Sequence, residues 1–250
     1  MSKPPITQRH SAVFITGTDT GVGKTVVTAA LARYLSQRGI DIGVMKPVET
    51  GIASPTSATS DAVRLKMAAE TQDELALIRP YCFRQPVAPL TAARLERKPI
   101  RIAGILSAYR RLRAQHELLL VEGVGGVHAP LTKSADVLEL IQHMQLPVIV
   151  VGRVGLGGVN HARLTIESLR QRKIPVLALV LNQTVRVQGV IAGQQARSTV
   201  ALLRELAEVP VIGPLPYAGM FGSGWNRGLE KAAKTAAIKQ LAGLITSSVR

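Results

Sequence analysis

The chain has 250 residues, of which 46% are apolar and only 3% are aromatic. This length suits one large domain or two small ones, with a core built mainly from Val, Leu, Ile and Ala. The single cysteine, Cys82, excludes an internal disulfide framework and a cysteine-rich metal site. No apolar run approaches a signal peptide or the ~18 residues of a membrane span, so we expect a cytoplasmic protein with no membrane partner.

The net charge is +15, from 31 lysines and arginines against 16 acidic residues. Such a balance is typical of a nucleic-acid-binding protein, or of an enzyme with an arginine-rich surface that handles anionic ligands. The basic residues are dispersed, no motif reads bases, and few aromatic side chains could stack on them. These observations favour the enzyme, with no specific nucleic-acid partner.

The first predicted elements are a buried strand over Ala12–Gly17 and a helix over Lys24–Arg38. The connecting loop ends in Gly-Lys-Thr at Thr25, but it departs from the strict phosphate-loop pattern because Thr18 stands where the first glycine belongs. A chance Gly-Lys-Thr in an ordinary loop is the alternative. The strand, loop, lysine and helix together favour a nucleotide-binding loop.

In such a loop, backbone N–H groups wrap a phosphate chain at the positive end of the helix. Lys24 can reach the β- and γ-phosphates, and the Thr25 hydroxyl can hold Mg²⁺. The residues predicted to hold ATP here are Gly21, Val22, Gly23, Lys24, Thr25 and Val26.

The next strand, over Ile42–Pro47, carries Lys46 at its end, and a helix over Ser60–Glu70 follows. A lysine at the end of a buried strand is costly unless it meets an anion, so we predict an anion-binding role in preference to a surface lysine. Asp61 opens the helix. Capping of the helix and contact with a metal ion explain Asp61 equally well.

A third strand, over Leu118–Gly123, places Glu122 where P-loop proteins carry an acidic residue that helps to hold Mg²⁺. The glycines that follow, through Gly126, allow close backbone approach to a ligand, with a structural turn as the alternative. Further along, Asn160 could be a helix N-cap. Asn182 could read a base edge or cap the junction of a strand and a loop.

Strands alternate with helical patterns along the chain. The remaining strands are predicted at Val148–Arg153, Val176–Asn182 and Val211–Pro214. The remaining helices are predicted at Leu90–Leu95, Ala103–Ala114, Ala135–His143, His161–Arg172, Ser198–Glu208 and Leu229–Ile245. This order predicts an α/β protein with a three-layer P-loop NTPase fold, in which helices cover both faces of a mostly parallel sheet. No linker or repeat is apparent, so we expect one domain over residues 1–250.

The chain resembles the dethiobiotin synthetases, ATP-dependent carboxylases that close the ureido ring in biotin biosynthesis. The resemblance runs from Val13 to about Tyr217. It rests on the motifs at Thr16–Thr25, Lys46–Gly51, Ser60–Asp61, Pro80–Tyr81, Pro86, Val121–Gly126, Gly157–His161 and Leu215–Tyr217. The variant phosphate loop belongs to this pattern, which explains the failed strict motif.

The resemblance implies a homodimer that carboxylates 7,8-diaminononanoate with CO₂, using ATP and Mg²⁺. It implies that Lys24 and Lys46 are catalytic and that Thr25, Asp61 and Glu122 hold Mg²⁺. Other implied ATP contacts are Gly123, Val124, Gly125, Asn182, Gln183, Leu215, Pro216 and Tyr217. The implied substrate contacts are Thr20, Thr50, Gly125 and Asn160, the last from the partner subunit.

Two positions depart from the family pattern, since Val127-His128 replaces an aromatic residue and Gly21 replaces an acidic residue of some relatives. One rival function is a partitioning or site-placement ATPase of the deviant P-loop type. Those proteins carry a signature lysine early in the loop, whereas this chain has Asp19 there. A second rival, an amidoligase of the cobyrinate synthase type, needs a glutaminase domain for which this chain has no room.

Overall fold

The computed structural model describes residues 11–217, 221 and 224–248 of the chain. The main sheet has the strand order β2-β5-β1-β6-β7-β8, and every neighbouring pair is parallel. Its strands are β1 (Ser11–Gly17), β2 (Ile42–Met45), β5 (Leu118–Gly126), β6 (Val148–Arg153), β7 (Val176–Asn182) and β8 (Val211–Leu215). The prediction of a mostly parallel sheet is confirmed.

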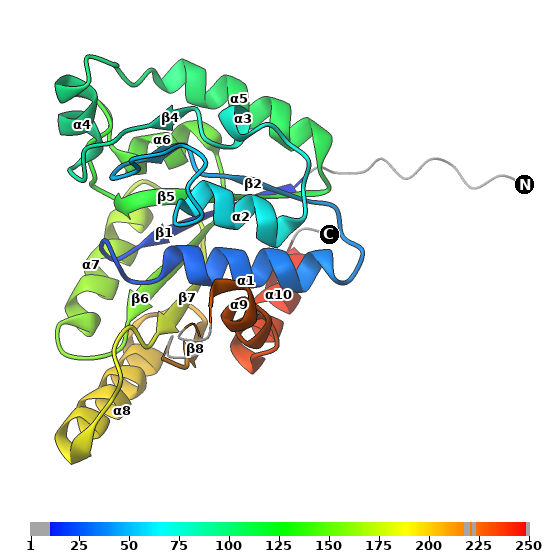
Figure 1. Ribbon diagram of the computed structural model, residues 1–250. Coiled ribbons are helices and arrows are strands. Elements are labelled where there is room, and N and C mark those ends of the chain that lie inside the picture. The colour runs from blue at the N-terminus through cyan, green and yellow to red at the C-terminus, as the bar shows by residue number, and fades with distance from the viewer. Residues whose placement is uncertain (1–10, 218–220, 222–223, 249–250) are drawn as a thin grey trace, which may run out of the picture.

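Helices cover both faces of the sheet, as Figure 1 shows. One face is covered by α1 (Lys24–Ser36), α2 (Asp61–Ala69), α9 (Trp225–Ala233) and α10 (Ala236–Ser248). The other is covered by α4 (Pro89–Leu95), α5 (Ile102–Gln115), α6 (Val137–Met144), α7 (Gly158–Gln171) and α8 (Gly189–Leu206). The predicted three-layer P-loop NTPase fold is confirmed.

The two core layers follow from the period of two along each strand. In β1, Val13 and Ile15 pack against the layer of α1, whereas Ala12 and Phe14 pack against the opposite layer. Successive side chains of a strand point to opposite faces, so a strand buried on both faces is apolar throughout. Because all six strands of this sheet are parallel, the segments that follow them meet along one edge.

Three short elements between β2 and α4 were not predicted. These are β3 (Val48–Glu49), α3 (Leu75–Ile78) and β4 (Tyr81–Cys82). β3 and β4 form a separate two-stranded parallel pair, with Glu49 opposite Cys82. Elements of two to four residues are too short to show a periodic pattern, so they could not be predicted from periodicity.

The predicted start of the helix at Ser198 was wrong, because α8 begins at Gly189. Its first turns carry exposed apolar side chains, with Val190 at 82% and Ile191 at 74% exposure. An apolar residue that faces solvent weakens the amphipathic pattern from which a helix is recognised.

The single final helix predicted over Leu229–Ile245 is two helices, α9 and α10. The break lies at Thr235, whose hydroxyl oxygen accepts a hydrogen bond from Ile238 N at 3.4 Å and donates one to Ala232 O at 2.7 Å. Threonine favours such local bonds at a helix start, but without a glycine or proline the break left little trace in the sequence. Within the described residues, none of the helices combines the length and apolarity needed to cross a bilayer.

Candidate active site

The loop between β1 and α1 is tightly folded over its own lysine. Gly23 is the N-cap of α1 with φ +94°, and a Cβ there would lie 2.0 Å from Asn182 Nδ2. Only glycine fits this left-handed and crowded position. Lys24 Nζ donates to Asp19 O at 2.9 Å, and Asn182 Nδ2 donates to Val22 O at 3.0 Å. The loop is therefore held from both sides before any phosphate binds.

A buried cluster of charges lies beside this loop, on the ends of β2 and β5 and the start of α2. Lys46 Nζ contacts Glu122 Oε1 at 2.5 Å and Asp61 Oδ2 at 2.9 Å. Thr25 Oγ1 donates to the same Glu122 Oε1 at 2.8 Å. We call these four residues the lysine cluster. It brings together side chains that lie up to 97 positions apart in the sequence.

Burial and neighbouring charge set the protonation of this cluster. Burial is the main cause that lowers the pKa of Lys24 from 10.5 to about 8, and the positive charge of Lys46 adds to it. Burial alone would lower the pKa of Lys46, but the Glu122 and Asp61 carboxylates outweigh it and raise that pKa. Lys46 is therefore charged at neutral pH, whereas Lys24 is closer to losing its proton.

The two carboxyl groups respond differently to the same surroundings. Burial raises the pKa of Glu122 against the opposing charge of Lys46. For Asp61, burial would also raise the pKa, but the Lys46 ammonium outweighs burial and lowers it. The carboxylate that is more open to solvent thus keeps its charge more easily than the fully buried one.

The donor atoms of the lysine cluster fit a hard cation such as Mg²⁺. Glu122 Oε2 is buried and, within the described residues, has no hydrogen-bond partner. A carboxylate oxygen without a donor is costly to bury, and carboxylate and hydroxyl oxygens are the ligands that Mg²⁺ takes. No group of three or more His, Cys, Asp or Glu side chains forms a complete metal site in the described part of the chain. A metal here would therefore share its coordination with phosphate oxygens and water.

A second buried cluster supports the first. Arg79 Nη1 donates to Glu49 Oε2 and to Ser60 Oγ, both at 2.6 Å, and Arg79 Nη2 donates to Pro55 O at 2.7 Å. Glu49 Oε1 also accepts a hydrogen bond from the backbone N–H of Asp61. We call Glu49, Ser60 and Arg79 the arginine cluster. It fixes the loop before α2 and the backbone that carries Asp61.

The arginine cluster was missed at the level of sequence. Glu49 and Ser60 lie within recognised motifs but were given no role, and Arg79 was not considered. A signal was available only for Arg79, which directly follows the apolar run Leu75–Ile78. A charge inside an apolar run is expected to have a partner when buried.

Capping of the helix and contact with a metal ion were the two explanations of Asp61, and the structure shows which group its side chain contacts. Ser60 is the N-cap of α2, and its Oγ accepts from Val63 N at 3.4 Å. The Asp61 side chain instead contacts Lys46. Asp61 is therefore not the N-cap itself, although it lies in the first turn of α2, and its contact with a metal ion stays a prediction.

Two adjoining cavities lie at this edge of the sheet. The smaller, about 340 Å³, is lined by loop residues, by Lys46 and Asp61 of the lysine cluster, and by Arg64 and Trp225. The larger, about 720 Å³, is lined by Asp19, Pro86, Pro89, Gly126, His128 and Ser168, among others. Thr20, Thr50, Val124 and Gly125 line both. Three of the predicted substrate contacts, Thr20, Thr50 and Gly125, therefore lie where the two cavities join.

His128, one of the two departures from the family pattern, faces the larger cavity. Its Nδ1 lies 2.9 Å from Asp136 Oδ2, and its Nε2 lies 3.2 Å from Ser168 Oγ. The neighbouring Val127 is instead buried in the core. Both residues line the larger cavity, but His128 is the more exposed of the two.

Asn160 lies apart from both cavities. It lines a groove of about 970 Å³ between α7 and α8, together with Leu156 and Ile191. The N-cap of α7 is Gly157, so Asn160 sits inside the first turn and the capping explanation for it is wrong. Leu164 lines both this groove and the larger cavity, so the two are neighbours.

The residues predicted to hold adenine lie on the ends of β7 and β8. Asn182 is opposite Leu215 in the sheet, and Gln183 N donates to Leu215 O at 3.0 Å. Leu215 is buried, whereas Pro216 and Tyr217 are exposed. The structure thus groups these residues behind the phosphate loop, outside the lining of the smaller cavity.

The fold and this edge of the sheet define a class of protein. A parallel sheet that feeds a glycine-containing loop into a helix, with Lys24, Thr25 and an acidic strand end at Glu122, is a P-loop nucleotide-binding protein. A family model described as an AAA domain matches residues 11–221. A chain of the MinC:MinD cell division protein complex from Aquifex aeolicus aligns with a TM-score of 0.59 at 16% identity, covering 95% of this chain and 96% of that one. This likeness shows the fold alone.

Sequence relatives identify the family. The ATP-dependent dethiobiotin synthetase BioD of Thermodesulfovibrio yellowstonii is 41% identical over 213 residues, covering 82% of this chain and 88% of the relative. The protein of the same name from Bacillus velezensis is 37% identical, covering 81% and 85%. The chain therefore belongs to the ATP-dependent dethiobiotin synthetase family, and it is an enzyme.

Proposed function

We propose that this enzyme carboxylates 7,8-diaminononanoate with CO₂ and closes the ureido ring of dethiobiotin, with hydrolysis of ATP to ADP and phosphate. The observation that carries the proposal is the position of Lys46, a buried charged lysine that lines the smaller cavity together with the phosphate-loop residues. Two lysines at the positive end of a helix suit a reaction in which one anion is made and then phosphorylated.

The reaction requires three steps in one site. A neutral amine of the substrate attacks CO₂, which forms an N–C bond and, on loss of a proton, a carbamate. A carbamate oxygen attacks the γ-phosphoryl group of ATP, the bond to the β-phosphate oxygen breaks, and ADP leaves. The second amine attacks the carbonyl carbon of this mixed anhydride, the ring closes, and phosphate leaves with the original carbamate oxygen.

The protein contributes position and charge to these steps. Lys24 and Lys46 would stabilise the carbamate and the phosphoryl group, and Thr20, Thr50 and Gly125 would align the diamine where the two cavities join. Fixed charges aimed at developing negative charge, and reactants held in line, account for most of the acceleration in phosphoryl transfer. No protein nucleophile is required.

Thr25, Asp61 and Glu122 would hold Mg²⁺, which neutralises charge on the phosphates when bound. Glu122→Gln is expected to raise the Mg²⁺ concentration for half-maximal ATP binding by about 10- to 100-fold, the range found when a partner of a metal site is lost. ATP binding followed by calorimetry across a Mg²⁺ titration measures this without turnover. An unchanged Mg²⁺ dependence would contradict the assignment.

We also propose a homodimer in which Asn160 of one subunit meets the far end of the substrate in the other. The groove between α7 and α8 carries strongly exposed apolar side chains, with Leu156 at 82% and Ile191 at 74% exposure. Exposed apolar patches of this kind mark protein interfaces, and a second copy would cover them. Analytical ultracentrifugation is expected to give a dimer, and Ile191→Asp is expected to shift it to monomer with loss of ring closure.

A single assay tests the activity. Phosphate release from ATP is expected only when diaminononanoate and bicarbonate are both present, with dethiobiotin as the product. The rival partitioning ATPase predicts release stimulated by DNA instead. Some DNA binding at low salt is expected from the +15 charge alone. ATP-gated or sequence-specific binding near physiological salt, without ring closure, would overturn the proposal.

A further inference from the structure

Arg64 is a cation that lines the smaller cavity, and the proposed carboxylase reaction assigns it no role. It stands one turn after Asp61 on α2, so the two residues share a face of the helix. It lines the smaller cavity together with Lys24 and Lys46. No ion pair involves Arg64 within the described residues, whereas Lys46 has two carboxylate partners.

The side chain of Arg64 is held in place from two sides. Its Cζ lies 4.3 Å from the centroid of the Trp225 ring, and its Nε donates to Ala58 O at 3.2 Å. A guanidinium over an indole is a favourable cation–π arrangement that leaves the in-plane N–H donors free. The two terminal nitrogens of Arg64 are thus not committed to another group by these contacts.

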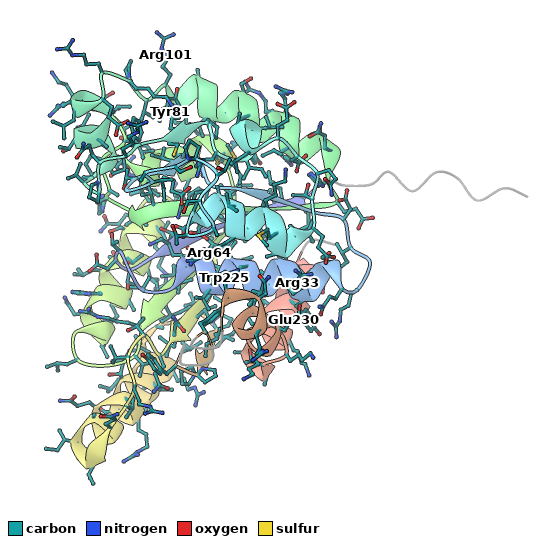
Figure 2. The ribbon with its side chains drawn as sticks, in the orientation of Figure 1. Arg33, Arg64, Tyr81, Arg101, Trp225 and Glu230 are labelled. Atoms are coloured by element: carbon teal, nitrogen blue, oxygen red, sulfur yellow. The ribbon has the colours of Figure 1, made fainter. Side chains whose placement is uncertain are left out.

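Trp225 is itself part of a braced element. It begins α9 and stacks on Phe221 with ring centroids 4.9 Å apart. Further along α9, Glu230 pairs with Arg33 of α1 at 3.4 Å. Figure 2 shows Arg64 and Trp225 close together beside the start of α1, which lies between α2 and α9, with Arg33 and Glu230 further along α1. The helix α9, which carries the indole, is therefore tied to α1, the helix that follows the phosphate loop.

We propose that Arg64 binds the polyphosphate of the nucleotide and that Trp225 is its positioning residue. This rests on the proposed function only in that a nucleoside triphosphate occupies the smaller cavity. In that cavity Lys46 is neutralised by Glu122 and Asp61, so Arg64 and Lys24 are the lining cations free of a carboxylate contact among the described residues. A planar guanidinium offers two parallel donors to phosphate oxygens, which a lysine cannot do.

The test compares ligands with and without phosphate. Arg64→Ala is expected to weaken binding of ATP and of inorganic tripolyphosphate by about 10- to 100-fold, the effect of one lost hydrogen bond to a charged group. Adenosine binding is expected to stay unchanged. Arg64→Lys should bind ATP with intermediate affinity, because it keeps the charge and loses the fork. Arg111→Ala, which removes an exposed arginine of α5, is the matched control with no expected effect.

Trp225 is the only tryptophan of the chain, so its fluorescence reports on this wall of the cavity. ATP and tripolyphosphate are both expected to change its emission. Trp225→Phe should retain ATP affinity, and Trp225→Leu should lose about two- to fivefold, the value of an exposed cation–π contact.

Two results would overturn the inference while wild-type ATP binding persists. One is unchanged tripolyphosphate affinity in Arg64→Ala, and the other is an equal loss of adenosine and ATP affinity, which indicates a structural role. Absence of ATP binding in the wild-type protein would instead sink the proposed function itself.

Discussion

The lysine cluster and the arginine cluster are two buried arrangements of opposite charges joined by consecutive residues, Ser60 and Asp61. In the arginine cluster both oxygens of Glu49 accept hydrogen bonds. In the lysine cluster Glu122 Oε2 has no partner within the described residues. The Glu49 carboxylate is thus satisfied within the protein, although Arg79 Nε has no partner among the described residues, whereas the Glu122 carboxylate keeps a free oxygen for a ligand.

Both clusters carry a cost that the rest of the fold must offset. Removing charges from water is expensive, and a buried pair recovers the cost only with good geometry and further hydrogen bonds. The difference is that both oxygens of the Glu49 carboxylate find partners within the protein. The lysine cluster is expected to offset the full cost of burying its charges only when phosphate and a cation are bound.

The largest expected effect comes from breaking the arginine cluster. Arg79→Met leaves Glu49 buried without its cation and is expected to lower the free energy of unfolding by about 3–5 kcal/mol. Urea denaturation measures this change. The double variant Glu49→Leu/Arg79→Met should recover part of the loss, because the lone buried charge is gone. Equal stability of Arg79→Met and wild type would contradict a structural role.

Lys46→Ala is expected to lower turnover by about 10²–10³-fold, or ~3–4 kcal/mol in transition-state stabilisation, with ATP affinity largely kept. The reason is the loss of one preorganised charge beside developing negative charge. Steady-state ring closure and calorimetric ATP binding separate the two quantities. Turnover near the wild-type value would show that the lysine has no role in the reaction.

The neighbours Ser60 and Asp61 allow the sharpest comparison of the two clusters. Asp61→Asn should reduce ring closure about tenfold or more through weaker metal binding, with little change in stability. Ser60→Ala should lower the free energy of unfolding by ~1 kcal/mol through loss of the N-cap, with a smaller effect on activity. Activity and urea denaturation of both variants test this. The reverse pattern would exchange the roles of the two clusters.

The smallest expected effect concerns Cys82, which is paired with Glu49 across β3 and β4. Burial raises the pKa of the Cys82 thiol, so less of it is thiolate at neutral pH. Alkylation by iodoacetamide is therefore expected to be slower for the folded protein than for the urea-unfolded chain at the same pH. Equal rates would indicate that this side of the arginine cluster opens readily.

The sequence by itself determined the layered fold and the family. Apolar strands buried on both faces, and helices between them, carry their own periodicity, so Val148–Arg153 and Val176–Asn182 were predicted to the residue. The phosphate loop could also be predicted, because Gly23, Lys24 and Thr25 are consecutive and form a local motif between a strand and a helix. The family followed from ordered motifs and is confirmed by relatives with 41% and 37% identity.

Only the tertiary structure decided which distant charges meet. Arg79 pairs with Glu49 across 30 positions of the sequence and Lys46 pairs with Glu122 across 76, and no local sequence pattern extends over such separations. In the sequence, Arg64 is one of many dispersed basic residues, and only the fold shows that its guanidinium lies over the Trp225 ring. The periodicity of a segment indicates which face of its helix or strand is buried. The pairing of charges depends instead on how whole elements pack against one another, and no single segment of the sequence determines that packing.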